Sequence, residues 1–372
     1  MSINHTLDKE SEMKKIILIL VPVLLMTALY AVDFDISGEF RTRAAIYNDF
    51  AENDGGYVDG RFNIGFDSQF HKNLSFRVAA EVGDIVWGNG GGAIGTSEAV
   101  EITELNFNYK IDAIDANIIV GQQYWMDRMA LVMDDYFSGI MLQKQIGDGI
   151  STEFAWMKGV EGIKTAKDDY DVFMAHAQLN QDNPVGMYLF FGNDSDIDYS
   201  NLSLMPYVAL EMGIASVDAT AFMDMQMADD TEMGFGAAVK AKLDMDLFEL
   251  GLDVLMATEH GLTTISPWYQ NGLYIYGIGK HHDGLNLYWG TPYEANAELF
   301  TSAVGSLRAP LNENIAAFAA MGYLKDMGFE ANAGIEYELI PDLMNMSAYG
   351  AFGVHDNEVN NYILGTSMKL EF

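Results

Sequence analysis

The chain contains no cysteine among its 372 residues. This absence excludes a disulfide framework, a thiolate metal site and a lipid-modified cysteine behind an export signal. Basic residues are also scarce, since 20 Lys and Arg stand against 54 Asp and Glu and leave a formal charge of −34. An excess of negative charge on this scale argues against nucleic acid and other polyanions as partners. It makes cations the natural counterpart.

Long apolar runs are absent apart from one, residues 16–31, which follows two lysines and ends among small residues. A basic, then apolar, then small-residue order at the N-terminus is typical of a secretory signal peptide. The run is also shorter than the ~20 apolar residues that a membrane-spanning helix needs. We therefore predict a signal peptide over residues 1–31, with Met13 as an alternative start, and a single mature domain over residues 32–372. An uncleaved helical anchor is the alternative.

From residue 32 onward, apolar and polar residues alternate with a period of two in segments separated by Gly, Asn and Asp. In residues 33–47, for example, the even positions are apolar or small and the odd positions carry the charges. This period places the apolar side chains on one face of a β-strand and the polar side chains on the other. Eighteen such segments are predicted as strands: 33–47, 58–70, 74–86, 100–111, 116–123, 137–146, 150–158, 170–179, 185–191, 202–210, 214–225, 233–243, 247–257, 297–308, 314–324, 329–339, 343–354 and 361–372.

The connections between these segments alternate between short ones, such as 71–73 and 147–149, and longer ones, such as 87–99 and 258–296. Short periplasmic turns alternating with longer external loops are the signature of an outer-membrane barrel. The hydrocarbon of a bilayer offers no hydrogen-bond partner to the backbone. A sheet of such strands must therefore close on itself, so that every backbone donor is paired within the protein. We predict an all-β, transmembrane, antiparallel up-and-down β-barrel of eighteen strands. Sixteen is the alternative, because the pairing around 258–308 is ambiguous.

Two soluble architectures compete with the barrel. A β-sandwich with this many strands would split into two domains joined by a linker, and a β-helix would show a short fixed repeat. The sequence contains neither a Pro- or Ser-rich linker nor such a repeat. The membrane barrel is therefore the favoured fold.

The final predicted strand ends in Phe372, the last residue of the chain. A terminal Phe that closes an amphipathic strand resembles the C-terminal signature of bacterial outer-membrane proteins. That resemblance implies recognition by the barrel-assembly machinery. Together with the signal peptide, it predicts export to the bacterial outer membrane, with outer-membrane lipid around the barrel.

The chain has only six arginines, and four of them fall on the polar face of the first three predicted strands. We expect them to form a basic ladder on one wall of the lumen. Opposed basic and acidic groups in a channel create a transverse field that orients polar solutes. The alternative is that these arginines only neutralise neighbouring acids within the wall. The four are Arg41, Arg43, Arg61 and Arg77.

The third long connection, residues 124–136, has too much apolar character for a solvated external loop. We expect it to fold inward, to bury its apolar residues against the wall and to narrow the passage. Its charged residues would then face the passage. They are Asp127, Arg128, Asp134 and Asp135.

The segment 117–123 that leads into this loop, the exit at 137–139 and the final strand resemble bacterial porins, whose third loop narrows the pore opposite an arginine cluster. More loosely, the chain resembles barrels of the alginate-export type, which have eighteen strands. A polyanion such as alginate would need a lumen rich in Lys and Arg, whereas the remaining polar faces here are acidic. Rings of carboxylates favour cations. The predicted lumen acids are Glu330, Glu336 and Glu338.

Asp194, Asp196 and Asp198 place three carboxylates at alternate positions, a spacing that calcium can use. The stretch lacks the glycine and the distal glutamate of a helical calcium loop, so a solvated acidic loop is favoured and calcium is the alternative. No other cofactor is expected. No histidine lies in a recognisable nucleophile or zinc pattern, so no enzymatic activity is expected.

The longest connection, 258–296, is rich in aromatic residues. We expect a packed cap, and the alternatives are folding over the mouth, binding of sugar rings or contact with a neighbour. The favoured function of the whole chain is passive diffusion of small hydrophilic solutes, with a preference for cations. A surface barrel for adhesion, lattice or filament contact and a substrate-specific carbohydrate channel are the alternatives. A homotrimer is one expected assembly, since porins of this kind are often trimers.

Overall fold

The computed structural model describes most of the chain from residue 33 onward. The predicted signal peptide, Met13, Asp196 and Asp198 lie outside the described residues. Within the part that is described, no helix is long and apolar enough to cross a membrane. The described ranges are 33–48, 54–87, 100–160, 169–179, 182–195, 199–228, 231–277, 293, 298–355 and 360–372.

The described residues form eighteen β-strands, and each strand overlaps one of the segments predicted from the alternation. Most boundaries agree within three residues, and the prediction of eighteen strands is confirmed. The strands are β1 (Asp33–Asn48), β2 (Asp54–His71), β3 (Leu74–Val86), β4 (Val100–Ile111), β5 (Ala116–Met126), β6 (Asp134–Ile146), β7 (Ile150–Val160), β8 (Tyr170–Leu179), β9 (Val185–Asp194), β10 (Tyr199–Met212), β11 (Ala215–Met227), β12 (Thr231–Met245), β13 (Phe248–Ala257), β14 (Phe300–Pro310), β15 (Ile315–Leu324), β16 (Gly328–Ile340), β17 (Met344–His355) and β18 (Asn360–Glu371).

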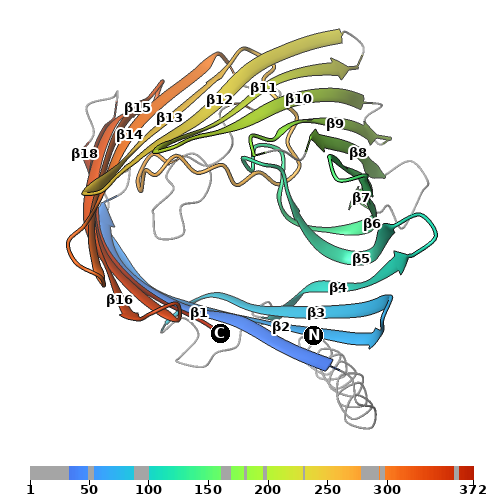
Figure 1. Ribbon diagram of the computed structural model, residues 1–372. Coiled ribbons are helices and arrows are strands. Elements are labelled where there is room, and N and C mark those ends of the chain that lie inside the picture. The colour runs from blue at the N-terminus through green and yellow to red at the C-terminus, as the bar shows by residue number, and fades with distance from the viewer. Residues whose placement is uncertain are drawn as a thin grey trace, which may run out of the picture.

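These strands form one sheet that closes into a barrel (Figure 1). Each strand pairs antiparallel with its neighbours in the chain, and β1 also pairs with β18, from Glu39 opposite Glu371 to Asn48 opposite Tyr362. The alternative of sixteen strands is wrong, because the doubtful region contributes β14, which pairs with both β13 and β15. Closure gives every strand two partners, as a sheet in hydrocarbon requires.

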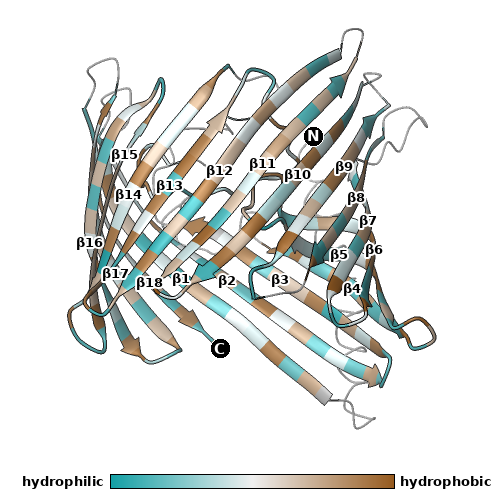
Figure 2. Cartoon of the chain, turned by 45° about the horizontal axis from the view of Figure 1, so that its top comes forward, coloured by the Kyte–Doolittle hydropathy of each residue, from teal (hydrophilic) through white to brown (hydrophobic). Residues whose placement is uncertain are grey.

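The two faces of the sheet differ in polarity, as the alternation predicts. On β1, Phe34, Ile36 and Ile46 point outward and are 37%, 53% and 57% exposed, whereas Arg41 on the other face is 5% exposed. Figure 2 shows the same alternation of hydrophobic and hydrophilic residues along the other strands. An apolar outer face and a polar inner face suit a barrel that has lipid outside and water inside.

The buried core lies inside the barrel, because two stretches leave the wall and fill part of the lumen. One is the loop 127–133 between β5 and β6, and the other is 258–277, which follows β13 and runs within the ring of strands in Figure 1. Leu131, Tyr269 and Tyr276 have no exposed surface. The connection 258–296 was expected to form a packed cap; its described part is packed, but it lies inside the barrel against the inner wall.

Candidate functional site

The loop between β5 and β6 is wound around one carboxylate. Asp127 is 1% exposed and accepts hydrogen bonds of 2.7–3.2 Å from the backbone N–H groups of Met129, Leu131, Val132 and Met133. Burial raises the pKa of the Asp127 carboxyl, and the four donors oppose that rise. The expectation that Asp127 faces the passage is wrong, because its oxygens are used to order the loop.

The side chain of Arg128 reaches from this loop across the interior and contacts β10 and β11. Its Nε lies 2.5 Å from Oδ1 of Asp218, and its guanidinium carbon lies 5.6 Å from the centre of the Tyr207 ring. Four strands, β6 to β9, separate the end of β5 from β10 in the sheet, so the arginine reaches its partners across the lumen. A carboxylate partner and an aromatic face both stabilise a guanidinium in this position.

The two aspartates that follow the loop lie on opposite faces of the sheet. Asp135 lies opposite Trp125, which is 7% exposed, and accepts a hydrogen bond from the Ser266 hydroxyl at 2.5 Å. Asp134 accepts a hydrogen bond from the hydroxyl of Tyr124, a side chain that is 47% exposed. Successive residues of a strand point to opposite faces, so Asp135 is on the lumen side and Asp134 is on the outer side. The expectation that Asp134 faces the passage is wrong.

The second interior stretch lies directly against the loop. The N–H of Ile265 donates to the carbonyl of Val132 at 2.9 Å, and the N–H of Trp268 donates to the carbonyl of Ala130 at 3.0 Å. The two connections are far apart in the chain, and backbone hydrogen bonds join them into one interior layer. We call residues 127–133 and 261–277 together the interior layer.

Wall carboxylates hold the first part of the stretch after β13. Asp224 on β11 accepts a hydrogen bond from the Thr263 hydroxyl at 2.8 Å, and Asp253 on β13 accepts one from the Tyr269 hydroxyl at 2.7 Å. The ammonium of Lys240 lies 4.4 Å from the centre of the Tyr269 ring. Burial raises the pKa of the Tyr269 hydroxyl, which keeps it protonated as the donor to Asp253.

Glu330 on β16 holds the far end of the same stretch. Its carboxylate accepts hydrogen bonds of 2.7–2.9 Å from the consecutive backbone N–H groups of Tyr274, Ile275 and Tyr276. The residue is on the inner face, as predicted, but it has no exposed surface. It therefore does not act as a solvated lumen charge, because the stretch that it holds covers it.

The predicted basic ladder lies on the inner face of β1 to β3. Arg41 lies between Lys369 of β18 and Arg61 of β2 in the register of the sheet. Arg43 forms two hydrogen bonds to the carboxylate of Asp59, at 2.9 and 2.6 Å. Lys369, Arg41 and Arg61 thus form a row across three strands, and Arg43 beside this row is paired with an acid of the adjacent strand.

The next two arginines are paired in the same way. Arg61 lies 3.1 Å from Glu81, and Arg77 bridges Asp67 at 2.5 Å and Glu104 at 2.8 Å. The two interpretations of these arginines are compatible, since the residues line the lumen and also neutralise acids of the wall. Paired arginines add little net positive charge to the passage.

The remaining predicted lumen acids lie near the short turns. Glu336 pairs with Arg308 at 3.0 Å, and Glu338 accepts a hydrogen bond from the N–H of Asp342 at 2.9 Å. Asp194 is the last residue of β9. Among the described residues no group of three or more histidines and acids is arranged to hold a metal ion, so calcium at the acidic loop stays a prediction.

Sequence reasoning missed a polar and aromatic cluster on the inner face of β7 to β10. His176 lies 3.1 Å from Glu153 and 2.8 Å from the Tyr207 hydroxyl, and its ring stacks on Tyr188 with centroids 4.2 Å apart. This cluster forms the surface on which Arg128 rests. The alternation places each member on the inner face, but the sequence contains no signal for the register that brings them together.

No family model and no curated protein matches the chain. Solved structures do match. OpdK of Pseudomonas aeruginosa with vanillate has a TM-score of 0.59 at 11% identity, over 91% of this chain and 98% of that one. OpdF of the same organism in complex with glucuronate has a TM-score of 0.59 at 12% identity, over the same shares. A BenF-like porin from Pseudomonas fluorescens Pf-5 has a TM-score of 0.56 at 13% identity, over 91% and 99%.

The chain has the fold of the outer-membrane porins. The likeness extends over nearly the whole length of each of these proteins, and it includes the closed barrel that the register shows directly. The porin-like barrel predicted from the alternation and from the final strand is therefore confirmed as a fold.

Proposed function

We propose that the chain is a porin of the bacterial outer membrane, through which small hydrophilic solutes diffuse passively. The observation that carries this proposal is a closed barrel with an apolar outer face, a charged inner face and an interior layer that narrows the lumen. The porin fold of the similar structures supports it. The predicted signal peptide and the terminal Phe372 support export and insertion by the barrel-assembly machinery, and a homotrimer is the assembly that we expect.

A preference for cations follows from the way the charges are used. Arg43, Arg61 and Arg77 are each paired with wall carboxylates. Glu338 on the inner face and Glu313 in the turn between β14 and β15 form no ion pair among the described residues. An excess of unpaired carboxylates concentrates cations in a narrow aqueous passage.

Planar-bilayer recording tests both parts of the proposal. The purified barrel should give ohmic single-channel steps in KCl, and a salt gradient should give a reversal potential whose sign corresponds to cation preference. A barrel that does not conduct would favour the alternative function, a surface protein for adhesion, lattice or filament contact. An open channel with anion preference would refute the charge argument and leave the fold unchanged. We expect no enzymatic activity.

A substrate-specific channel is the second candidate. Two of the similar structures contain a small molecule, vanillate with OpdK and glucuronate with OpdF. Saturable block of the KCl current by one solute, and not by others of the same size, would distinguish such a channel from a general porin.

A further inference from the structure

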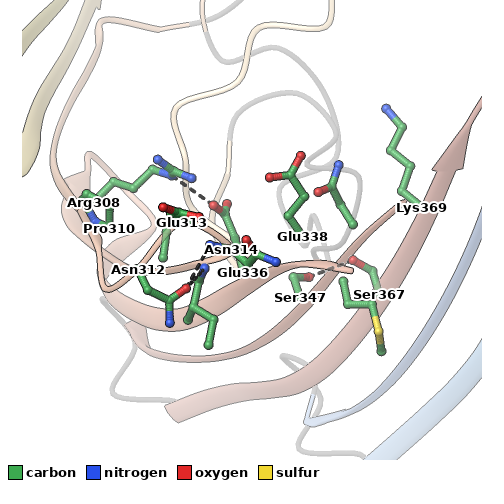
Figure 3. A pocket seen from close by; sticks show the side chains of 14 residues that line it. Arg308, Pro310, Asn312, Glu313, Asn314, Glu336, Glu338, Ser347, Ser367 and Lys369 are labelled. Atoms are coloured by element: carbon green, nitrogen blue, oxygen red, sulfur yellow. Dashed lines mark hydrogen bonds and ion pairs between the residues drawn. The ribbon is translucent and has the colours of Figure 1, made fainter. Parts of the chain in front are cut away.

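A recess opens in the inner wall at the end of the barrel where the short turns lie. Its volume is about 540 Å³, and its lining comes from β14 to β18 and from the turn between β14 and β15 (Figure 3). Sites for small molecules range over roughly 300–1,000 Å³. The recess is therefore large enough for a solute of the size of a sugar ring.

The basic side chains that line the recess already form ion pairs with acidic side chains. Arg308 lies 3.0 Å from Glu336, and Lys369 lies 2.8 Å from Glu39 and 2.5 Å from Glu371. Two acids share the single ammonium of Lys369. A carboxylate on a solute would meet acids beside each of these bases, so the recess does not favour an anion.

Two further acids of the lining have no basic partner among the described residues. One oxygen of Glu338, Oε1, accepts a hydrogen bond from the N–H of Asp342 at 2.9 Å, and no basic side chain of the described residues pairs with this carboxylate. Glu313 lies in the turn at the edge of the recess and forms no ion pair within the described part of the chain. A cationic group on a solute would supply the missing partner for these acids.

Neutral hydrogen-bonding groups lie beside the unpaired carboxylate. In the register of the sheet, Asn345 on β17 is directly opposite Glu338 on one side and Lys369 on the other. Directly opposed side chains on adjacent strands begin about 5 Å apart. In Figure 3, Glu338 and Lys369 extend into the same open space. An Asn amide both donates and accepts, so it can bond a hydroxyl group next to the cation.

Aromatic rings form the next row of the wall toward the interior layer. Tyr274 stacks on Tyr349 with centroids 4.3 Å apart and lies 6.3 Å from Phe318. Tyr349 and Phe318 lie two residues along their strands from Ser347 and Ala316, which line the recess. Tyr274 and Tyr349 are 6% and 5% exposed, so this row closes the recess on the side of the interior layer and presents no free ring face.

We propose that the recess binds a small polyhydroxylated solute that carries one ammonium group, such as an amino sugar. The ammonium pairs with Glu338, and the hydroxyls bond to Asn345 and its neighbours. The proposal rests on the porin function and adds the class of solute to it. It predicts the opposite charge preference from that of a barrel that holds glucuronate, as one similar structure does.

Three solutes with the same ring test this preference: glucosamine, glucose and glucuronate. In single-channel recordings, at a pH where its amine is protonated, glucosamine should interrupt the KCl current at a concentration about tenfold lower than glucose does, which corresponds to about 1.4 kcal/mol. Glucuronate should be the weakest of the three. Glu338→Gln should bring glucosamine to the level of glucose. Asp148→Asn, which removes a carboxylate from the turn between β6 and β7, is the matched control and should leave the order unchanged.

Calorimetric titration of the detergent-solubilised barrel with glucosamine separates this inference from the porin function. Saturable heat that disappears in Glu338→Gln supports the recess even if the barrel does not conduct. Equal effects of the three solutes, or an unchanged response in Glu338→Gln, would overturn the inference while an open channel kept the porin function. Circular dichroism and heat-dependent gel mobility of each variant show that the barrel is folded.

Discussion

The main chains of Gly38 and Phe372 exchange two hydrogen bonds. The N–H of Gly38 lies 2.8 Å from the carbonyl oxygen of Phe372, and the N–H of Phe372 lies 3.0 Å from the carbonyl oxygen of Gly38. The Phe372 ring occupies the place of the missing side chain, since a Cβ on Gly38 would lie 2.6 Å from Cζ of that ring. The last residue of the chain thus covers the closing seam of the barrel, where it also lies near Phe62.

Gly38→Val should therefore impair closure. The added side chain would overlap both the Phe372 ring and the carbonyl oxygen of Asn63, which is backbone and cannot move freely. The expected loss is about 1–3 kcal/mol, as for overpacking in general. Heat-dependent mobility on gels measures the folded fraction. Gly305→Val, on the outer face of β14 with nothing within 4 Å of its Cβ position, is the matched control and should fold normally.

Asp127→Asn should loosen the loop between β5 and β6. The amide offers one acceptor oxygen in place of two, and its NH₂ group faces backbone N–H donors, so the loss should be about 3 kcal/mol. Single-channel conductance should rise or fluctuate. Asp134→Asn removes the same charge on the outer face and should leave conductance unchanged. A steady, unaltered conductance in Asp127→Asn would show that the loop does not limit the passage.

Glu330→Ala should release the far end of the stretch after β13. Three buried backbone N–H groups would lose their acceptor, at a cost of about 3 kcal/mol or more. Limited proteolysis should then cut near Tyr274 or Tyr276, where the wild-type backbone is protected. Glu211→Ala on β10 removes an exposed glutamate that does not contact the interior layer. Protection that persists in Glu330→Ala would contradict the anchoring role.

Arg77→Gln should increase the preference for cations. The substitution leaves Asp67 and Glu104 without their shared base, and it adds two uncompensated carboxylates to the inner wall. Because Arg77 is partly exposed, the loss of stability should be about 1 kcal/mol. The reversal potential in a KCl gradient should move in the cation-selective direction. Lys72→Gln in the turn between β2 and β3, with a side chain that is 75% exposed, should produce a much smaller shift.

The strands were predictable because lipid and water lie on opposite faces of the same sheet. On β16 the outward Phe329 and Ile335 are 44% and 50% exposed, and Glu330 between them on the inner face is buried. This contrast repeats at every second residue, so each strand carries its own signal. The role of the terminal Phe372 as a barrel-assembly signal stays a prediction.

The roles of individual lumen residues were not predictable in this way. Asp127 binds four N–H groups of its own loop, and Glu330 binds three N–H groups of a stretch that lies more than fifty positions earlier in the chain. Both sets of hydrogen bonds depend on where a segment without regular secondary structure contacts the barrel wall. The apolar character of 124–136 and the aromatic residues of 258–277 were visible signals of burial. Neither signal indicates which carboxylate accepts the hydrogen bonds of the backbone N–H groups.

The contact between Asp135 and Ser266 joins positions 131 residues apart, and β7 to β13 lie between them along the chain. Neighbouring strands can pair as soon as their short turn forms, but bringing these two positions together costs loop-closure entropy until the intervening strands are in place. The constriction is thus a late product of assembly. We therefore expect a barrel that has not yet formed this contact to have a wider lumen than the folded protein.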